Sequence, residues 1–173
     1  FFVSTYGTRN ASGFGDNYVD EVYTGVDCLR LQCNVTGAGT GLTVVASDIT
    51  NIDFSLRQGG QIDGSINDSL NNDLAGVRVE VYDSSARLVG FTSTDVLGNY
   101  RLEALPTGNY FVRTRNLLGF QDQLHSGGSC NPFCDPVLGT PVSVVEGSIV
   151  SGIDFTLVQS ASLAGTVTLS GSP

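Results

Sequence analysis

The chain has 173 residues and a net charge of -9, and its 8 basic residues are all Arg. A chain this acidic repels phosphate, which argues against nucleic-acid binding, while a hydrophobic content of 40% argues against a disordered acidic tail. It contains no apolar run of the length that spans a membrane, so we expect no membrane span in this segment.

Short alternations of apolar and polar residues predict β-strands along most of the chain. Val77, Val79 and Val81 alternate with polar side chains, which is the period-two pattern of a strand with one buried face. Turns rich in Gly, Pro, Asp and Asn separate the segments. In chain order we expect strands at residues 61–66, 77–83, 88–93, 100–102, 108–114, 142–145 and 153–157. Short antiparallel strands in this number predict an all-β, immunoglobulin-like β-sandwich.

The chain also repeats itself. For example, the sequence IDFSL at residues 52–56 returns as IDFTL at residues 153–157. Several matches occur in the same order along the chain, namely 1–5 with 110–114, Cys33 with Cys134, 42–45 with 142–145, 52–56 with 153–157, and 64–66 with 165–167. Such self-similarity predicts tandem sandwich repeats of about 100 residues.

The matches divide the chain into three parts. We expect residues 1–59 to be the C-terminal part of one repeat, residues 60–159 to be a complete repeat, and residues 160–173 to be the first strand of the next. Because half of the strands of a sandwich cannot bury a core, we expect the chain to be a segment of a longer array. Strand exchange between neighbouring molecules is the alternative.

Four stretches of residues 64–110 carry a family resemblance. They read GSI at 64–66, LAGVRV at 74–79, TDVLGNY at 94–100 and LPTGNY at 105–110. This pattern resembles the carboxypeptidase regulatory-like domains and is similar to the B-type repeats of Gram-positive surface adhesins. The resemblance implies a transthyretin-like or immunoglobulin-like sandwich that serves as a stalk, spacer or accessory domain. Some adhesin repeats carry a Lys–Asn isopeptide bond, which this chain excludes because it has no Lys.

The four cysteines form two local pairs, Cys28 with Cys33 and Cys130 with Cys134. We expect one small disulfide in each pair, which contributes about 2 kcal/mol because the closed loop is short. Free or intermolecular thiols and a metal site are the alternatives, and zinc is disfavoured because the pairs belong to different repeats. Paired cysteines imply an oxidising compartment and therefore secretion.

Few residues suggest catalysis or metal binding. The only histidine, His125, is next to Ser126, but adjacency in sequence does not make a catalytic triad. We therefore expect that the chain is not an enzyme and binds no cofactor. Some related adhesin repeats bind calcium in the loop at residues 67–73, which makes Asp68, Asp73 and Asp95 calcium candidates. Ordinary turns, in which Asp binds backbone N–H groups, are the alternative.

A glycan or another surface ligand is the other kind of partner that we considered. Phe14, Tyr18 and Tyr23 lie close together in sequence and could contact a ligand or a neighbouring subunit, although sugar sites commonly use Trp, which is absent. Asn10, Asn34 and Asn67 match the N-glycosylation pattern.

The linkers between the expected repeats, residues 57–61 and 158–162, have equal and short lengths, so we expect the same geometry between successive repeats. Together these features predict a structural, non-enzymatic segment of a secreted or cell-surface protein that forms a stalk, surface layer or filament. Its partners would be neighbouring repeats or identical subunits in a fibre. An adhesive or carbohydrate-binding module and an accessory domain of a secreted hydrolase are the alternatives.

Overall fold

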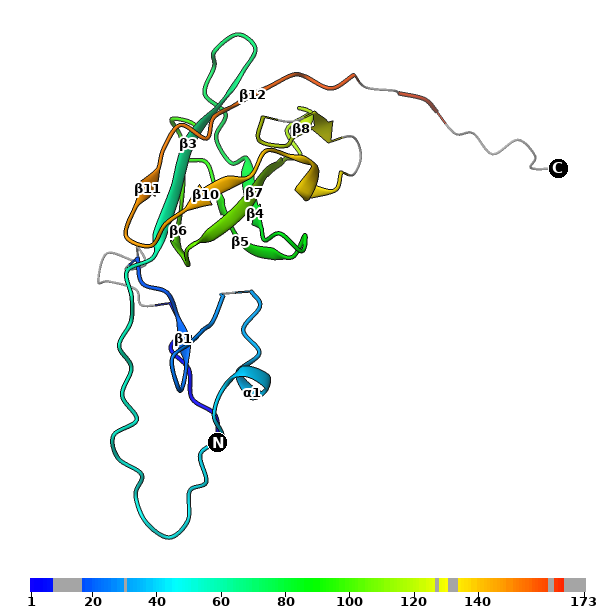
Figure 1. Ribbon diagram of the computed structural model, residues 1–173. Coiled ribbons are helices and arrows are strands. Elements are labelled where there is room, and N and C mark those ends of the chain that lie inside the picture. The colour runs from blue at the N-terminus through cyan, green and yellow to red at the C-terminus, as the bar shows by residue number, and fades with distance from the viewer. Residues whose placement is uncertain (8–16, 30, 127, 131–133, 162–163, 167–173) are drawn as a thin grey trace, which may run out of the picture.

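The computed structural model describes residues 1–7, 17–29, 31–126, 128–130, 134–161 and 164–166. Two sheets pack face to face in the part that we call the sandwich, residues 60–157 (Figure 1). The first sheet has the order β10 (Val142–Val144), β7 (Gly108–Arg115), β4 (Arg78–Tyr82), β5 (Leu88–Ser93). In the second, β3 (Gly60–Asp68) pairs with β6 (Asn99–Leu105), β11 (Ile149–Val150) and β12 (Phe155–Leu157). The predicted all-β, immunoglobulin-like sandwich is confirmed.

The core lies between these two sheets. Val79 and Val81 contribute to it from β4, and Ile62 and Ile66 contribute from β3, and all four side chains are fully buried. Burying each such side chain contributes about 1.5–3 kcal/mol to the free energy of unfolding. The alternation that predicted these strands therefore has its physical origin in one face of each sheet being sealed against the other.

Two strand pairs run parallel, and our expectation of antiparallel strands throughout is wrong for them. Ile149 pairs with Gln61 near the start of β3, and Phe155 pairs with Ile66 near its end. The turn after β10 carries the chain from the first sheet to the second, beside the start of β3, where Ser148 O accepts from Gln61 N. From there β11 and β12 follow β3 in the same direction. The last strand of the sandwich therefore finishes beside the end of the first one.

β3 and the segment leading into β12 approach each other most closely at Gly64. Asp154 Oδ1 accepts hydrogen bonds from Ser65 N at 2.7 Å and from Ser65 Oγ at 3.0 Å. A Cβ atom at Gly64 would overlap the carbonyl oxygen of Ile153. Glycine at this position is therefore required by the close approach of two backbones.

Other strands differ from the prediction in extent. β6 continues to Leu105, beyond the expected end at residue 102. β11 and the small pair β8 (Asp122–Gln123) and β9 (Ser129–Cys130) were not predicted. Strands of two residues show no alternation from which they could be recognised.

The N-terminal segment, residues 1–59, contains little regular structure. It has the strand pair β1 (Glu21–Val22) and β2 (Val26–Asp27) and the short helix α1 (Val35–Ala38); a 3-10 helix, η1 (Pro136–Leu138), lies in the sandwich. Residues 42–45 and 52–56 form no strand, although they match β10 and β12 in sequence. No counterpart of β3 lies beside residues 52–56 in the described chain, so they have nothing to pair with. In the part of the chain that the structure describes, no helix is long and apolar enough to cross a membrane.

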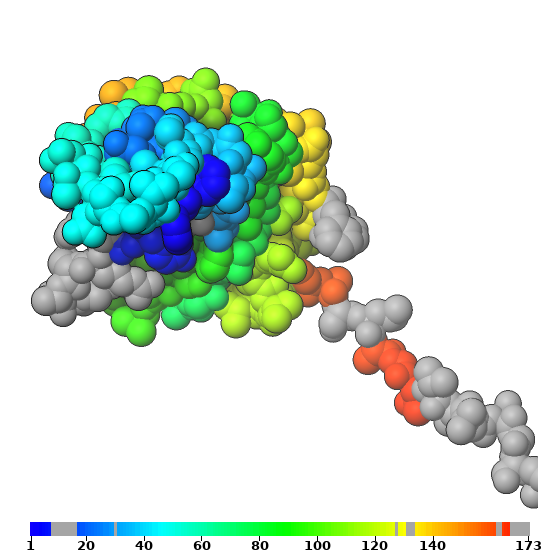
Figure 2. Space-filling view, turned by 90° about the horizontal axis from the view of Figure 1, so that it is seen from below, coloured from blue at the N-terminus to red at the C-terminus, as the bar shows by residue number. Residues whose placement is uncertain are grey.

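The N-terminal segment lies against one end of the sandwich. Figure 1 shows it below the two sheets, and Figure 2, seen from below, shows it (blue to cyan) in front of them. We call this the near end of the sandwich, where β3 begins at Gly60. The opposite end, where β3 finishes at Asp68 beside Leu157 of β12, is the far end.

Candidate functional site

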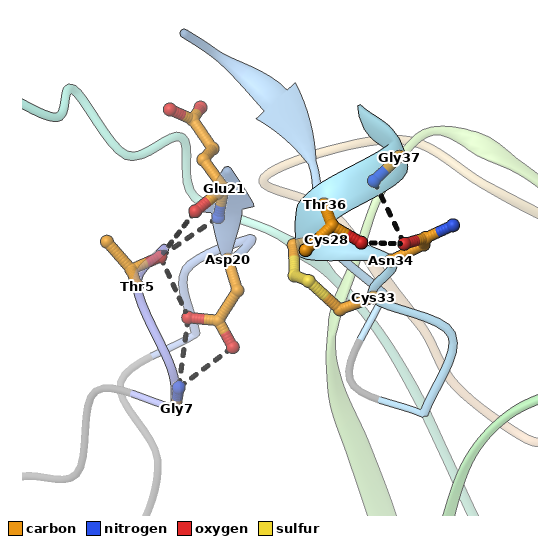
Figure 3. Close-up of a disulfide and its surroundings, with 9 residues drawn as sticks. All are labelled: Thr5, Gly7, Asp20, Glu21, Cys28, Cys33, Asn34, Thr36 and Gly37. Atoms are coloured by element: carbon orange, nitrogen blue, oxygen red, sulfur yellow. Dashed lines mark hydrogen bonds between the residues drawn. A yellow bond between two sulfur atoms is a disulfide. The ribbon is translucent and has the colours of Figure 1, made fainter. Parts of the chain in front are cut away.

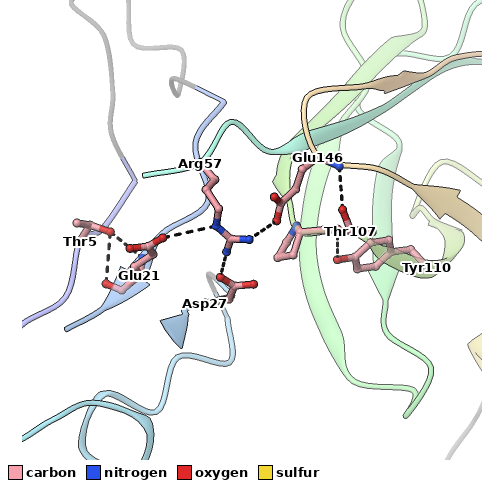
Figure 4. A network of polar contacts seen from close by, with 8 residues as sticks. Thr5, Glu21, Asp27, Arg57, Thr107, Tyr110 and Glu146 are labelled. Carbon is pink, nitrogen blue, oxygen red and sulfur yellow. Dashed lines mark hydrogen bonds and ion pairs between the residues drawn. The ribbon is translucent and has the colours of Figure 1, made fainter. Parts of the chain in front are cut away.

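Arg57 joins the N-terminal segment to the near end of the sandwich (Figure 4). Its Nη1 donates to Oε1 of Glu146 at 2.8 Å, and its Nη2 donates to Oδ1 of Asp27. Its Nε lies 3.7 Å from Oε1 of Glu21. Glu21 and Asp27 belong to the β1–β2 pair, whereas Glu146 lies in the turn between β10 and β11. One guanidinium group thus holds carboxylates from both sides of the junction together.

Asn17 makes a second connection across the junction. Its Nδ2 donates to Gly59 O at 2.5 Å, and its Oδ1 accepts from Ala104 N, on β6, at 2.7 Å. Within the N-terminal segment, the backbone bond from Gly59 N to Asn17 O at 2.7 Å holds Asn17 in place for the contact with Ala104. A Cβ atom at Gly59 would lie 2.6 Å from Ala104 Cα, so a side chain there would push the two parts apart.

Glu146 itself is held in place by the turn between β6 and β7. Its N–H donates to Oγ1 of Thr107 at 3.0 Å. In the same turn the hydroxyl of Tyr110 donates to Pro106 O at 2.9 Å (Figure 4). Burial raises the pKa of Tyr110 to about 12, and nearby carboxylates, Asp27 first, add to the shift. The raised pKa means that the Tyr110 hydroxyl continues to donate to Pro106 O above pH 10, where an exposed tyrosine would ionise.

Contacts within the N-terminal segment recur in the second half of the sandwich. Thr5 Oγ1 accepts from Glu21 N at 2.9 Å, and Thr114 Oγ1 accepts from Gln123 N at 2.8 Å. Isolated antiparallel bridges recur in the same way. The bridge between Ser4 and Val22 matches the one between Arg113 and Leu124, and the bridge between Tyr18 and Gln58 matches the one between Phe120 and Gln159. The repetition of sequence is thus accompanied by a repetition of hydrogen bonds.

The recurrence extends to packed rings. Tyr23 meets Phe54 edge to face, with ring centroids 6.1 Å apart, and His125 meets Phe155 edge to face at 6.2 Å. His125 thus occupies the place of Tyr23. Its ring is half-buried, and burial lowers its pKa although the charge of Asp154 acts in the opposite direction. The lone histidine packs at the edge of the core, against Phe155.

Both cysteine pairs are bonded in the structure. Cys28 is joined to Cys33 (Figure 3), with their Cα atoms 4.7 Å apart, and Cys130 is joined to Cys134, with Cα atoms 5.0 Å apart. The first bridge immediately precedes Asn34, whose Oδ1 caps α1. Each disulfide closes a small loop beside a short helical turn.

The calcium candidates lie in ordinary turns. Asp68 and Asp95 each accept hydrogen bonds from the backbone N–H groups two and four residues further along the chain. Hydrogen bonds from Asn72, its side chain first, hold the pKa of Asp68 below its usual value. Asp73 forms a backbone bridge with Asn67. Among the described residues, no group of three or more His, Cys, Asp or Glu side chains could hold a metal ion.

The aromatic candidates serve separate contacts. Tyr18 pairs through its backbone with Gln58, and Tyr23 packs on Phe54. Phe14 lies outside the described residues, as do Asn10 and most of residues 160–173. Among the described residues, no contact joins Tyr18 to Tyr23.

The residues that connect the two parts were not found from sequence. Arg57, Asn17 and Glu146 belong to no motif, and their partners lie 30 or more residues away along the chain. The only signal that could have indicated them is the short linker at residues 57–61, which predicts a close contact but not the residues that make it.

No protein-family model matches the chain, and no curated protein matches it in sequence. Among solved structures it is similar to the TIE protein of Bacillus anthracis (15% identity, TM-score 0.45, covering 58% of this chain and 17% of that one). It is also similar to GBS52, the minor pilin of Streptococcus agalactiae (17% identity, TM-score 0.43, covering 65% of this chain and 49% of that one). A third similar structure is chlorocatechol 1,2-dioxygenase of Pseudomonas putida (16% identity, TM-score 0.37, covering 60% of this chain and 61% of that one). The chain spans less than two thirds of each. At these low scores the similarities assign neither a family nor a function.

Proposed function

We propose that this chain is a structural, non-enzymatic segment of a long extracellular protein, in which sandwich repeats stack end to end into a stalk, surface layer or filament. The observation that carries the proposal is the parallel pairing of β12 with β3, Phe155 beside Ile66. When the first and last strands of a unit run in the same direction, the chain enters at one end and leaves at the other.

The distance between the two ends follows from the length of β3. At about 3.3 Å per residue, the nine residues from Gly60 to Asp68 span roughly 26 Å. Each added unit would lengthen the array by a similar amount or more. An antiparallel first and last strand would instead return the chain to the end at which it entered, and successive units would fold back on each other.

The junction supports a fixed rather than a free orientation between units. Arg57 and Asn17 cross it with side-chain hydrogen bonds, and Gly59 permits close backbone contact. Thr5 and Thr114 make equivalent hydrogen bonds, and Tyr23 and His125 make equivalent ring contacts, which supports residues 1–59 as the C-terminal part of a preceding repeat. On this proposal residues 60–159 are a complete repeat and residues 160–173 begin the next.

The proposed location outside the cell is supported by the two disulfides, which persist in oxidising compartments. The net charge of -9 would keep a long array soluble and limit side-by-side aggregation. We propose no second function, since within the described residues no observation favours sugar binding or a hydrolase partner.

Electron microscopy of the secreted full-length protein tests the proposal. Rods or fibres with a regular repeat along their length are the expected result. Compact isolated particles without any extended part would contradict it. A catalytic domain directly attached to this segment in the full-length sequence would favour the accessory role instead.

A further inference from the structure

We infer that the far end of the sandwich is an apolar docking surface for the near end of the following repeat, so that successive junctions of the array differ in chemistry. The inference rests on the proposed function and adds to it the kind of partner surface that this end accepts. It starts from the contacts that recur between the N-terminal segment and the sandwich.

The backbone defines which far-end residues correspond to the junction residues. Val19 N donates to Arg57 O at 2.9 Å, and Gln121 N donates to Val158 O at 2.8 Å. In the same way the bond from Gly59 N to Asn17 O recurs, between Ser160 N and Gly119 O, at 2.8 Å. At the far end Val158 therefore stands where Arg57 stands at the near end, and Gly119 stands in the place of Asn17.

The carboxylates that bind Arg57 are also replaced. Glu21 pairs with Asp27 across β1 and β2, and Gln123 pairs with Ser129 across β8 and β9. All three charged groups of the N-terminal segment at the junction thus have uncharged counterparts at the far end. A following repeat cannot be held there by the ion pairs that hold the sandwich to the N-terminal segment.

Apolar side chains are exposed at this end instead. Leu117 is fully exposed, at 102%, and Leu118 and Val158 are 52% and 50% exposed. The two leucines immediately precede Gly119, and Gly119 O accepts a hydrogen bond from Ser160 N, two residues after Val158. The segments that carry the leucines and Val158 therefore lie side by side. Single exposed leucines are common on protein surfaces, whereas apolar side chains that lie together in one patch mark interaction sites.

The turn that carries the leucines is ordered by its own hydrogen bonds. Asn116 Oδ1 accepts from Leu118 N at 2.9 Å and from Phe120 N at 3.3 Å. Asp122 Oδ1 in turn accepts from Asn116 N at 2.9 Å and from Asn116 Nδ2 at 2.8 Å. The leucines are therefore presented on a built surface, and docking them costs little conformational entropy.

The occupant follows from continuity with the junction already described. The corresponding surface of the N-terminal segment contacts Ala104 and Glu146 at the near end of the sandwich. The far end would therefore receive the same region of the next repeat. Because Val158 replaces Arg57, we expect an uncharged residue in that repeat at the position of Glu146.

The test compares the full-length protein with the 173-residue chain by hydroxyl-radical footprinting and mass spectrometry. Leu117 and Leu118 are expected to be several-fold less reactive in the full-length protein. Leu138, on η1 and 75% exposed, is the control and should react equally in both. A double variant, Leu117→Ser with Leu118→Ser, should increase radical labelling of the next repeat's near end and should leave the first junction unchanged.

Equal reactivity of the two leucines in both proteins would overturn the inference. Protection of the leucines that disappears on dilution would also overturn it, because that protection would come from a second molecule. A charged residue at the position of Glu146 in the next repeat would overturn it as well. If microscopy shows regular rods while the leucines stay reactive, the inference fails and the proposed function stands. If no repeat of this kind follows, both fail.

Discussion

Arg57 Nη1 and Glu146 Oε1 are 2.8 Å apart, although one residue belongs to the N-terminal segment and the other to a turn of the sandwich. The side chain of Arg57 is about half exposed, so the ion pair alone contributes little, about 0.2–1 kcal/mol. Its importance lies in orientation, since the same guanidinium group also binds Asp27. The ion pair therefore adds to the contacts of Asn17 and Gly59 that fix the relative orientation of the two parts.

Replacing Arg57 is expected to loosen the junction without unfolding the sandwich. In Arg57→Ala, hydrogen–deuterium exchange at the amides of Ala104 and Gly147 should rise several-fold, because their bonds to Asn17 Oδ1 and Gly59 O cross the junction that Arg57 helps to hold. Exchange in β4 and β7 should not change. Arg87→Ala, which removes a local pair with Asp83, is the matched control. Unchanged exchange at both amides would show that Arg57 does not secure the junction.

Gly64→Ala is expected to break the contact between β3 and the segment leading into β12. The added methyl group would overlap Ile153 O, and such overpacking typically lowers the free energy of unfolding by about 1–3 kcal/mol. Gly165 matches Gly64 in sequence but has open space around it, so Gly165→Ala is the control. Urea denaturation monitored by circular dichroism measures both. Equal stability of the two variants would contradict the described β3–β12 approach.

The stability of the chain should fall in mild acid because of His125. Burial lowers the pKa of His125 below its ordinary value of 6.5, with Asp154 opposing, so the folded state favours the neutral ring. Its stabilising effect is present above about pH 6.5 and is lost as the pH falls through the folded pKa.

The variant His125→Tyr restores the ring that Tyr23 provides on Phe54 and cannot titrate in this range. We expect thermal melts of the variant to show a flatter dependence on pH between 7 and 5 than those of the unmodified protein. The same slope in both proteins would rule out His125 as its source.

Glu80 should be important for stability although it lies on the outer face of β4. Its Oε2 accepts from Arg113 Nη2 at 2.5 Å and from the Tyr82 hydroxyl at 2.7 Å, and only 2% of its side chain is exposed. Burial raises the pKa of Glu80, but the bonds from Tyr82 and Arg113 outweigh it, so the net shift is downward.

A lowered pKa means that Glu80 stabilises the fold above its ordinary value of 4.5 and that this effect is lost as the pH falls below it. Glu80→Gln should lower the free energy of unfolding at pH 7 by about 1.5–3 kcal/mol, the range for hydrogen bonds to a charged group. At pH 3 the difference from the unmodified protein should shrink. A constant difference across this range in urea denaturation would argue against an ionised Glu80.

Much of the sandwich could be predicted because its strands carry their own signal. The alternation of Val77, Val79 and Val81 reflects one buried face, and that face is buried in the structure. Alternation identifies a strand but not its partner, so the parallel pairing of Phe155 with Ile66 was missed. Glu80 was expected on the solvent face, and its burial depends on Arg113, which is 33 residues away.

The repetition in sequence is accompanied by equivalent local contacts but not by equivalent strands. Tyr23 and His125 differ in chemistry but pack on phenylalanines that match in the repeated sequence, Phe54 and Phe155. In contrast, residues 52–56 repeat the pattern of 153–157 and still form no strand, because a strand requires a partner and not only a sequence. The junction residues could not be predicted, since Arg57 and its partners Glu146 and Asp27 are 89 and 30 residues apart along the chain and belong to no motif.

Small-angle X-ray scattering of successively longer pieces of the protein tests the end-to-end arrangement most directly. Each piece would contain residues 1–159 followed by zero, one or two further repeats. If the chain enters and leaves each unit at opposite ends, the maximum dimension of the piece should grow by the same increment with every added repeat, and this increment should be at least the length of β3. Growth that follows the shallow dependence of a compact domain, roughly the 0.38 power of chain length, would contradict the arrangement.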